Sequence, residues 1–404
     1  MTVLTDIFKS TLPPPTRKSE RWKYSPISKL LNSTLSTDSS EIDGGFSNEI
    51  APNPVEGLEA YRLVFRNGKF NHSLSDLPIA KGVICMPQSE VSGEDVPEFK
   101  NTYSKTEWVG ELNESYHQDG LFLKIDRNIK LDRPVLIHHL TDGKDVASFP
   151  RHFVRVEEGG EVDVVVWSSS TKNSSGMYNG ILEASIAPNA TLTLEKVCNE
   201  DGKIYHFSHE NIIQERDSKF KMHTFTVKGH WVRNELEIIS RGKGTDSIFN
   251  GAFLPTGNEH VDNHTTMDHT STDGTSSELY RGIMYGTSTG VFNGKVFVRP
   301  DAQRTNAFQQ NTNIVADRGA SINAKPELEI YADDVRCSHG ATVGELEDEL
   351  IFYLCARGID RESARRMLIG AYISDAIDEV KNIDIRSSIQ SVAENWLKQN
   401  LYEK

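Results

Sequence analysis

Between residues 159 and 301 the chain alternates strand-like runs with turns at a nearly constant spacing. Each turn is a pair of residues in which Gly, Asn, Asp or Pro favours a tight change of direction. The pairs recur at intervals of roughly 27 to 30 residues, and a fixed period in that range is typical of a solenoid. The pairs are Gly159–Gly160, Pro188–Asn189, Asp217–Ser218, Gly244–Thr245, Asp273–Gly274 and Pro300–Asp301.

The intervals between the turns hold runs of β-forming residues. A parallel coil of short strands, in which each coil stacks on the previous one and buries one face, accounts for this period. A β-sandwich is the alternative, but it usually has turns about every 8–12 residues and no longer repeat. The pattern therefore favours a mainly β chain built on a right-handed parallel β-helix. The runs include EVDVVVW, TLTLEKV, KFKMHTFTV, ELYRGIMY, ILEASIA, NELEIIS and VFNGKVFV.

The segments on either side of the repeat have a different character. Residues 1–55 combine scattered apolar positions with a Ser-, Asp-, Gly- and Pro-rich stretch, which predicts a helical N-terminal region and an exposed linker. Residues 56–343 read as β-rich, and the β-helix pattern is clearest in residues 150–343. Residues 344–404 predict a C-terminal helical domain. Covering the open end of the solenoid is one explanation for these helices, and docking of a partner is another.

Local signals place the helix boundaries within this C-terminal domain. Gly358 is a predicted left-handed cap that ends a first helix, and Asp360 is suited to cap a second. Apolar residues at helical spacing continue in IRSSIQSVAENWLKQNL, which predicts a third amphipathic helix.

Composition and charge narrow the class of partner. Hydrophobic residues make up 37% of the chain and charged residues 25%, as in ordinary globular proteins. The formal net charge of -14 repels phosphate backbones and anionic lipids. No apolar run has the length of a bilayer span, and the N-terminal residues lack the features of a signal peptide. We therefore expect a cytoplasmic protein that binds neither nucleic acid nor membrane.

The sequence offers little for an enzyme or a complete metal site. Its four cysteines, Cys85, Cys198, Cys337 and Cys355, are far apart and form no CxxC pair, which argues against a disulfide framework or a self-contained iron–sulfur or zinc site. Phosphate-binding GxxxxGK[ST], dinucleotide-binding GxGxxG, GxSxG and HExxH motifs are absent. We expect no catalytic residues and no ATPase activity. A carbohydrate-active β-helix enzyme is the alternative from a different class.

Two polar clusters carry the candidate chemistry, and the sharper one comprises Asp333, Asp334, Cys337 and His339. In an extended strand Cys337 and His339 point to the same side, so a thiolate and an imidazole can reach one soft or borderline metal ion. Two ligands make up only half of a four-coordinate metal site. The alternative is that Cys337 packs as a small apolar residue and His339 is hydrogen-bonded within the fold.

The second cluster lies in NEHVDNHTTMDHTSTDG. His260 and His264 share a strand face with Asp262, whereas His269 falls on the opposite face. A site with three histidine ligands would need a bend in the strand. We therefore favour a polar strand-and-turn segment over metal ligation.

The most specific signal is the segment LEIYADDVRCSHGATVG at residues 328–344. This segment, together with VFNGKVFVRPDAQRTNAFQQNTNI before it and RRMLIGAY after it, resembles the SufB/SufD family of iron–sulfur cluster assembly scaffolds, and within that family the SufD branch. The stretches VDNHTTMDHT and ERWKYSPIS resemble the family more loosely. The SufB branch is the alternative assignment, against which the length and the few cysteines argue.

The resemblance implies a scaffold that pairs with a SufB-like paralogue through its β-helix and passes clusters to apoproteins. The histidine that the family places at the heterodimer interface falls on His339 and the motif cysteine on Cys337, which implies an iron–sulfur cluster or iron held transiently and shared with the partner. It leaves open an FAD in the complex and a homodimer when the paralogue is missing. The resemblance also implies a SufC-type ABC ATPase bound to helices at about residues 345–380. Within them we assign the docking region to Leu350, Tyr353, Leu354, Met367 and Leu368.

Overall fold

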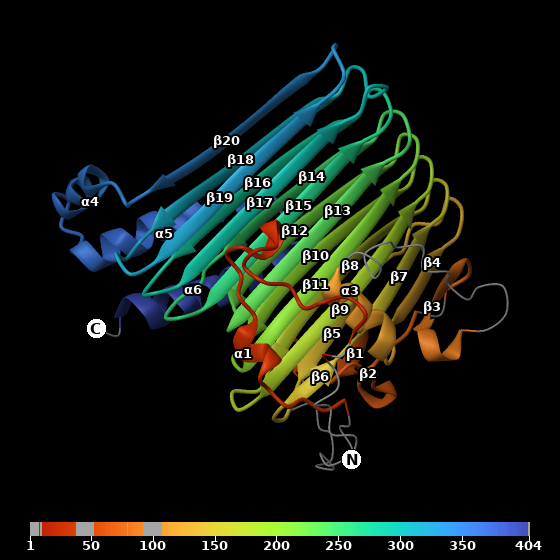
Figure 1. The fold of residues 1–404 in the computed structure, drawn as a ribbon, viewed down its shortest axis with the longest axis horizontal. Coiled ribbons are helices and arrows are strands. Elements are labelled where there is room, and N and C mark those ends of the chain that lie inside the picture. The colour runs from red at the N-terminus through yellow and green to blue at the C-terminus, as the bar shows by residue number, and fades with distance from the viewer. Residues whose placement is uncertain (1–7, 9, 38–51, 79, 92–106, 403–404) are drawn as a thin grey trace.

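A computed structural model describes residues 8, 10–37, 52–78, 80–91 and 107–402 of the chain. Figure 1 shows two long sheets of mostly parallel strands stacked face to face, with the C-terminal helices along one side. The two sheets together form a β-solenoid of about eight turns, which confirms the predicted fold class. Among the described residues no helix is both long and apolar enough to cross a membrane.

The first sheet contains ten strands, all paired in parallel except for β1 with β2. Its strands pair in this order: β2 (Lys69–Phe70), β1 (Tyr61–Arg66), β5 (Val135–Thr141), β8 (Glu161–Ser170), β10 (Thr191–Glu200), β12 (Lys219–Lys228), β14 (Asp246–Phe253), β16 (Thr275–Met284), β18 (Asn306–Val315) and β20 (Arg336–Gly344).

The second sheet also contains ten strands, and only β3 with β4 is antiparallel. The short β6 (Val146–Ser148) pairs with β9 beside the main path. The other strands pair in this order: β19 (Ser321–Ile330), β17 (Thr289–Val298), β15 (His260–His269), β13 (Trp231–Ser240), β11 (Lys203–Gln214), β9 (Ser175–Ile186), β7 (Arg151–Val156), β4 (Leu121–Ile125) and β3 (Val83–Pro87).

The recurring turns form one ladder along an edge of the solenoid. Five of the six predicted pairs hold a residue in the left-handed region, with φ between 55° and 71°. Gly, Asn and Asp adopt this region at low cost, which explains why they recur there. The backbone N–H of each such residue donates to a carbonyl of the next turn, as Asp217 does to Lys243 at 2.9 Å. In the last turn the left-handed residue is Arg304 rather than Pro300–Asp301, because the proline ring holds φ negative.

The interior of the solenoid is apolar on one side and polar on the other. Inward residues near the start of the first-sheet strands are large and apolar, such as Leu192, Leu194 and Phe220. Further along the same strands they become polar, as at Lys196 and Glu200, which are also buried. The alternation of side chains therefore continues across both halves, although only the apolar half gives a hydrophobic pattern.

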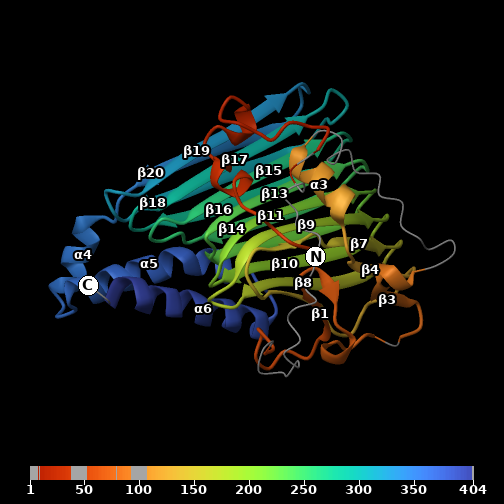
Figure 2. The same ribbon diagram turned by 60° about the horizontal axis from the view of Figure 1, so that its bottom comes forward.

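The C-terminal helices cover the outer face of the first sheet. α5 (Arg361–Ile377) and α6 (Ile383–Tyr402) lie side by side along this face in Figure 2. Ile373 and Trp396 from the helices pack with Trp167 and Phe225 from the sheet. The helices therefore cover a side of the solenoid and leave its last coil open. α4 (Asp348–Cys355) extends beyond them, and Asp360 caps α5 through a bond from the Ser363 N–H at 2.9 Å.

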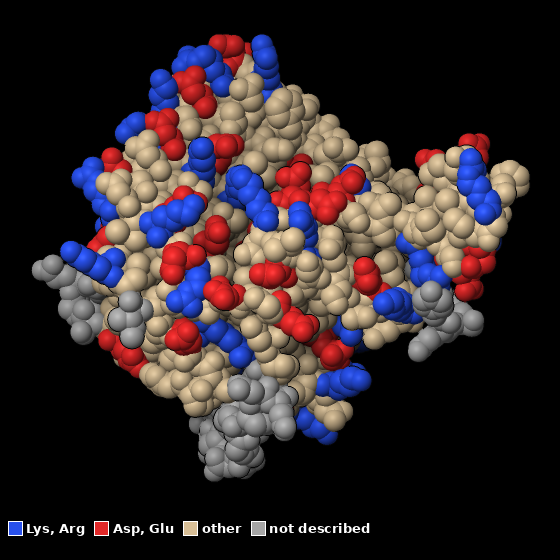
Figure 3. All heavy atoms as spheres, turned by 180° about the vertical axis from the view of Figure 1, so that it is seen from behind, with Lys and Arg blue, Asp and Glu red and all other residues tan. Residues whose placement is uncertain are grey.

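N-terminal segments cover the outer face of the second sheet. η1 (Glu20–Trp22), α1 (Ser28–Leu31) and α3 (Trp108–Tyr116) pack there, and two more short helices, η2 (His72–Leu74) and η3 (Gln88–Glu90), follow β2 and β3. On the face shown in Figure 3, acidic and basic side chains are interspersed. Ion pairs also join successive coils, such as Arg304 with Asp273 at 2.6 Å.

Candidate functional site at the open end of the solenoid

The last coil of the solenoid ends in two unpaired strand edges. Among the described strands, β20 pairs only with β18 and β19 pairs only with β17, so each is the last strand of its sheet. Both are long, with nine and ten residues. A long, uncovered edge presents a row of free backbone donors and acceptors, which proteins normally cover or shorten. This end is therefore suited to pair with another chain.

Cys337 and His339 lie on the inward face of β20, at this open end. In the register with β18 they stand above Ala307 and Gln309, which are buried in the interior. The two side chains therefore share a face, as the spacing of two residues predicts. Cys337 is half-buried and packs against the hydrophobic core, whereas His339 is exposed.

The environment of Cys337 favours the neutral thiol in the isolated chain. Burial raises the pKa of the Cys337 thiol above its ordinary value, and a backbone hydrogen bond at Ala307 only partly opposes this effect. A thiolate is the form that binds metal, so a cation brought to this end would have to displace the proton. In the isolated chain the Cys337 thiol is thus favoured in its protonated form.

Asp333 and Asp334 belong to the turn before β20 and add no ligand to this pair. The carbonyl of Asp334 accepts from the Arg304 N–H at 2.6 Å, and its N–H donates to Gln303 at 2.9 Å. Within the described part of the chain, the only group of three metal-binding side chains lies elsewhere, in the interior. Among the described residues, the candidate ligands at the open end are therefore Cys337 and His339.

Large apolar side chains are exposed near the open end. Phe308, Ile330, Tyr331 and Val343 are exposed on the last two coils, with 41 to 57% of their surface accessible. A cluster of this kind is typical of a surface that another protein covers. Both the unpaired edges and the exposed apolar side chains therefore make the open end a candidate interface.

The predicted docking region forms a second apolar surface on α4 and the start of α5. Leu350, Tyr353 and Met367 are exposed, whereas Leu354 and Leu368 are half-buried. Sequence reasoning missed Phe352, which is 74% exposed and lies between two of the predicted residues. Its signal was the continuous apolar run Leu350–Leu354, which is longer than one buried helix face requires.

The histidine cluster of β15 has a structural role. His260 and Asp262 contact Ser25 from the N-terminal segment, with His260 Nε2 3.0 Å from the Ser25 hydroxyl. His264 Nε2 lies 3.0 Å from Asp262, and His269 faces the interior, 2.9 Å from the Ser276 hydroxyl. These contacts suit a polar strand-and-turn segment, and the preference for it over metal ligation stays a prediction. No three-ligand metal group in the described residues includes these histidines.

Arg233 on β13 joins this cluster to the N-terminal segment. Its guanidinium pairs with Asp262, donates to the carbonyl of Arg21 at 2.9 Å and lies 4.0 Å from the centre of the Trp22 ring. Burial alone would raise the pKa of Asp262, but His264 and Arg233 outweigh it and lower that pKa below its ordinary value. The stretches ERWKYSPIS and VDNHTTMDHT therefore meet in one buried ionic network.

Comparisons with known proteins agree with the resemblance seen in the sequence. Residues 139–372 match the family described as "SUF system FeS cluster assembly, SufBD core domain", and residues 6–137 match the SufBD protein N-terminal region. The iron–sulfur cluster assembly protein SufD of Escherichia coli is 30% identical over 379 residues, which cover 93% of this chain and 87% of that protein.

More distant relatives show the same similarity. The chloroplastic protein ABCI7 of Arabidopsis thaliana is 27% identical over 94% of this chain and 82% of its own. SufD of Bacillus subtilis is 26% identical over 69% of this chain and 64% of its own.

Proposed function

Because this chain belongs to the SufBD family of iron–sulfur cluster assembly proteins, we propose that it is a SufD-like scaffold subunit that works with a SufB-like paralogue and a SufC-type ATPase. In this role it has no catalytic reaction of its own and supplies surfaces and ligands. The observation that carries the proposal is the open last coil, where two bare strand edges flank Cys337 and His339.

The paralogue joins at this open end by continuing the two sheets. A second β-helix with a bare edge can satisfy the free backbone groups of β19 and β20 and cover Val343 and its apolar neighbours. An interface of this kind is specific because the register of backbone hydrogen bonds fixes the alignment of the two chains. The heterodimer therefore brings ligands of the partner close to those of β20.

His339 and Cys337 supply part of the ligand set for the cluster, which is the cargo of the scaffold. The imidazole of His339 and the thiolate of Cys337 are suitable ligands for iron, and the paralogue supplies the remaining ligands. A cluster bound by a divided set of ligands loses them when the two scaffolds move apart, and acceptor apoproteins can then take it. His339 is the stronger candidate because it is exposed at the interface.

The ATPase binds the apolar surface of α4 and α5, which is formed by Leu350, Phe352, Tyr353 and Met367. Only residues 345–347 separate β20 from α4, so a movement of α4 is transmitted directly to the strand that carries Cys337 and His339. Nucleotide turnover in the ATPase would thus change the spacing of the two scaffolds. We also propose a cytoplasmic location, although the Arabidopsis relative is a chloroplastic protein by name.

The test is reconstitution with a SufB-like and a SufC-like protein from the same organism. We expect a stable complex, and we expect His339→Ala to lower cluster formation at least about tenfold without dissolving the complex. Ser338→Ala, on the opposite face of the same strand, is the control and should assemble clusters normally. Normal cluster formation by the His339→Ala complex would refute the role of His339.

A further inference from the structure

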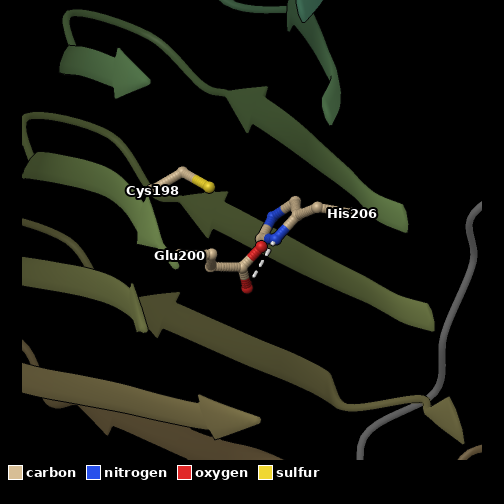
Figure 4. Close-up of side chains that lie close together, drawn as sticks. All are labelled: Cys198, Glu200 and His206. Atoms are coloured by element: carbon tan, nitrogen blue, oxygen red, sulfur yellow. Dashed lines mark hydrogen bonds and ion pairs between the residues drawn. The ribbon is translucent and has the colours of Figure 1, made fainter. Parts of the chain in front are cut away.

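A second group of metal-binding side chains lies inside the solenoid, where β10 turns into β11. Cys198 and Glu200 are two residues apart on β10 and both point inward, while His206 points inward from β11 in the other sheet. Figure 4 shows the three side chains converging across this edge of the interior. All three are almost fully buried, and their ligand atoms lie within 4.8 Å of one another.

The carboxylate of Glu200 lacks the partners that a buried charge normally has. One oxygen, Oε1, lies 3.2 Å from Nδ1 of His206. The other, Oε2, is buried with no hydrogen-bond donor among the described residues. The nearest buried cation on the same strand face, Lys196, is already held by Glu210 at 2.7 and 2.9 Å. A buried carboxylate left in this way is costly unless a further cation is present.

The Cys198 thiol is also buried with few polar partners. Its sulfur lies 3.4 Å from the carbonyl oxygen of Lys228 and also contacts the Glu200 carboxylate. Burial and the adjacent Glu200 carboxylate raise the pKa of the Cys198 thiol well above its ordinary value. A bound divalent cation would instead favour the thiolate form of Cys198, because a thiolate and a carboxylate together balance its two charges.

We propose that Cys198, Glu200 and His206 bind one divalent transition-metal ion of the zinc or ferrous type inside the solenoid. Sulfur, nitrogen and oxygen ligands on a tetrahedral ion are the usual set for such metals, and three protein ligands leave a fourth position for water. Binding displaces the proton of the Cys198 thiol to solvent, and metal bonds replace the contact between Glu200 and His206. The ring of Tyr178, stacked on His206 with centroids 4.4 Å apart, fixes the imidazole plane.

The spacing of the three ligand atoms suits a single ion. They lie within 4.8 Å of one another, as the ligands of one tetrahedral ion do. The site is also separate from the open end, since β12, β14, β16 and β18 lie between β10 and β20 in the first sheet. The ion would tie the two sheets together where the interior is polar.

The test measures metal in the full-length chain, purified without chelators from cells supplied with Zn²⁺, Fe²⁺ or Co²⁺. We expect about one ion per chain by elemental mass spectrometry. With Co²⁺ we also expect a sulfur-to-cobalt charge-transfer band. Cys198→Ser should lose the band, and Glu200→Gln and His206→Gln should each lower the metal content at least about tenfold.

Matched variants separate this site from other buried groups. Cys85→Ser removes another buried cysteine, and His223→Gln removes a buried histidine that lies 3.0 Å from Glu195. Both should keep the ion, and so should His339→Ala, since this inference does not depend on the role of the open end. Circular dichroism identifies any variant that fails to fold. Glu200→Gln keeps the shape of the side chain and removes only its charge. The metal content of this variant therefore tests directly whether the carboxylate binds the ion.

Two results would overturn the inference. One is a wild-type chain that carries no more metal than Cys198→Ser. The other is a metal content that is unchanged in both Glu200→Gln and His206→Gln.

Discussion

The two ends of the solenoid are built in opposite ways. At the first end, β2 and β3 pair antiparallel with β1 and β4, which interrupts the parallel sheets and ends them in short strands. At the last end, β19 and β20 are long and parallel, and their outer edges are unpaired among the described strands. Because the sheets end in short antiparallel strands at the first end, the long unpaired edges at the last end are a specific feature of the fold. The open end is therefore best explained as a binding surface.

The side chains buried inside the solenoid also differ between its two ends. Near the first end, large apolar residues such as Phe65, Leu123 and Ile137 are buried inward, beside the histidine pair His139 and His152. Near the last end, Gln309, Asn311 and Asn313 on β18 are buried polar residues. Apolar burial contributes stability directly, whereas buried amides mainly fix specific geometry through their hydrogen bonds. We therefore predict that the first end is the more stable part of the solenoid.

The largest effect on partner binding is expected from a charge placed at the open end. Val343→Lys introduces an inward-pointing charge on the edge strand β20, which opposes pairing with a second sheet. We expect binding of the SufB-like partner to weaken at least about a hundredfold, because a buried lysine without a counter-ion costs several kcal/mol. Size-exclusion chromatography with light scattering measures the complex.

Lys69→Glu, on β2 at the first end, is the matched control and should bind the partner normally. Because Val343 is 56% exposed, Val343→Lys should leave the isolated chain folded. If the Val343→Lys chain bound as tightly as the wild type, the partner would not pair along β20.

A cavity made at either end tests the difference in packing. Phe65 is fully buried between β2 and the core, so Phe65→Ala should lower the free energy of unfolding by about 3–5 kcal/mol. Val343→Ala at the open end should change it by less than about 0.5 kcal/mol in the isolated chain. Chemical denaturation of the two variants gives both values. Equal losses would contradict the proposed difference between the ends.

The sequence predicts the solenoid from its turns because those positions restrict the residue type. Left-handed turns need Gly, Asn or Asp, so Gly159, Asn189, Asp217 and Asp273 stand out at a fixed period. Strand β11 gives no such signal, because its inward residues are polar in the middle and the hydrophobic alternation is lost. Strands facing the polar side of the interior are therefore the ones that sequence patterns miss.

The candidate sites differ in how much the sequence reveals. Cys337 and His339 lie on one strand, so their spacing alone predicts that they share a face. The group of Cys198, Glu200 and His206 spans the turn between two sheets, and its geometry depends on how sharply the chain turns at residues 201–202. The network of Arg233 and Asp262 with residues 20–25 joins segments more than two hundred residues apart, which no local pattern encodes.

Buried titratable groups make the two ends respond oppositely to pH. Near the first end, His139 and His152 lie 3.0 Å apart, and burial lowers the pKa of His152 to about 3 and that of His139 well below its ordinary value. In the interior near the last end, Glu278 accepts hydrogen bonds from Thr265 and Gln309, yet burial raises its pKa to about 7.

These pKa shifts have opposite effects on the free energy of unfolding. Histidines with lowered pKa values contribute fully to it above pH 6.5, and this contribution is lost as pH falls. A glutamate with a raised pKa stabilises below about pH 4.5, and that contribution is lost as pH rises to about 7.

The smallest predicted effect follows from these signs. Between pH 8 and pH 5 the lowered pKa of His152 alone should cost the coils around it about 2 kcal/mol of local stability, while the coils around Glu278 should gain about 2 kcal/mol. Hydrogen exchange, expressed as protection relative to the intrinsic rate at each pH, measures both regions in one experiment.

Glu278→Gln should abolish the gain at the last end, because a neutral amide does not titrate and Gln309 can reverse its amide to accept from it. His152→Asn, whose carbonyl can accept from the Leu121 N–H as Nδ1 does at 2.9 Å, should reduce the loss at the first end. If both regions shifted in the same direction, the solenoid would unfold as one cooperative unit, and the contrast between its ends would be confined to their surfaces.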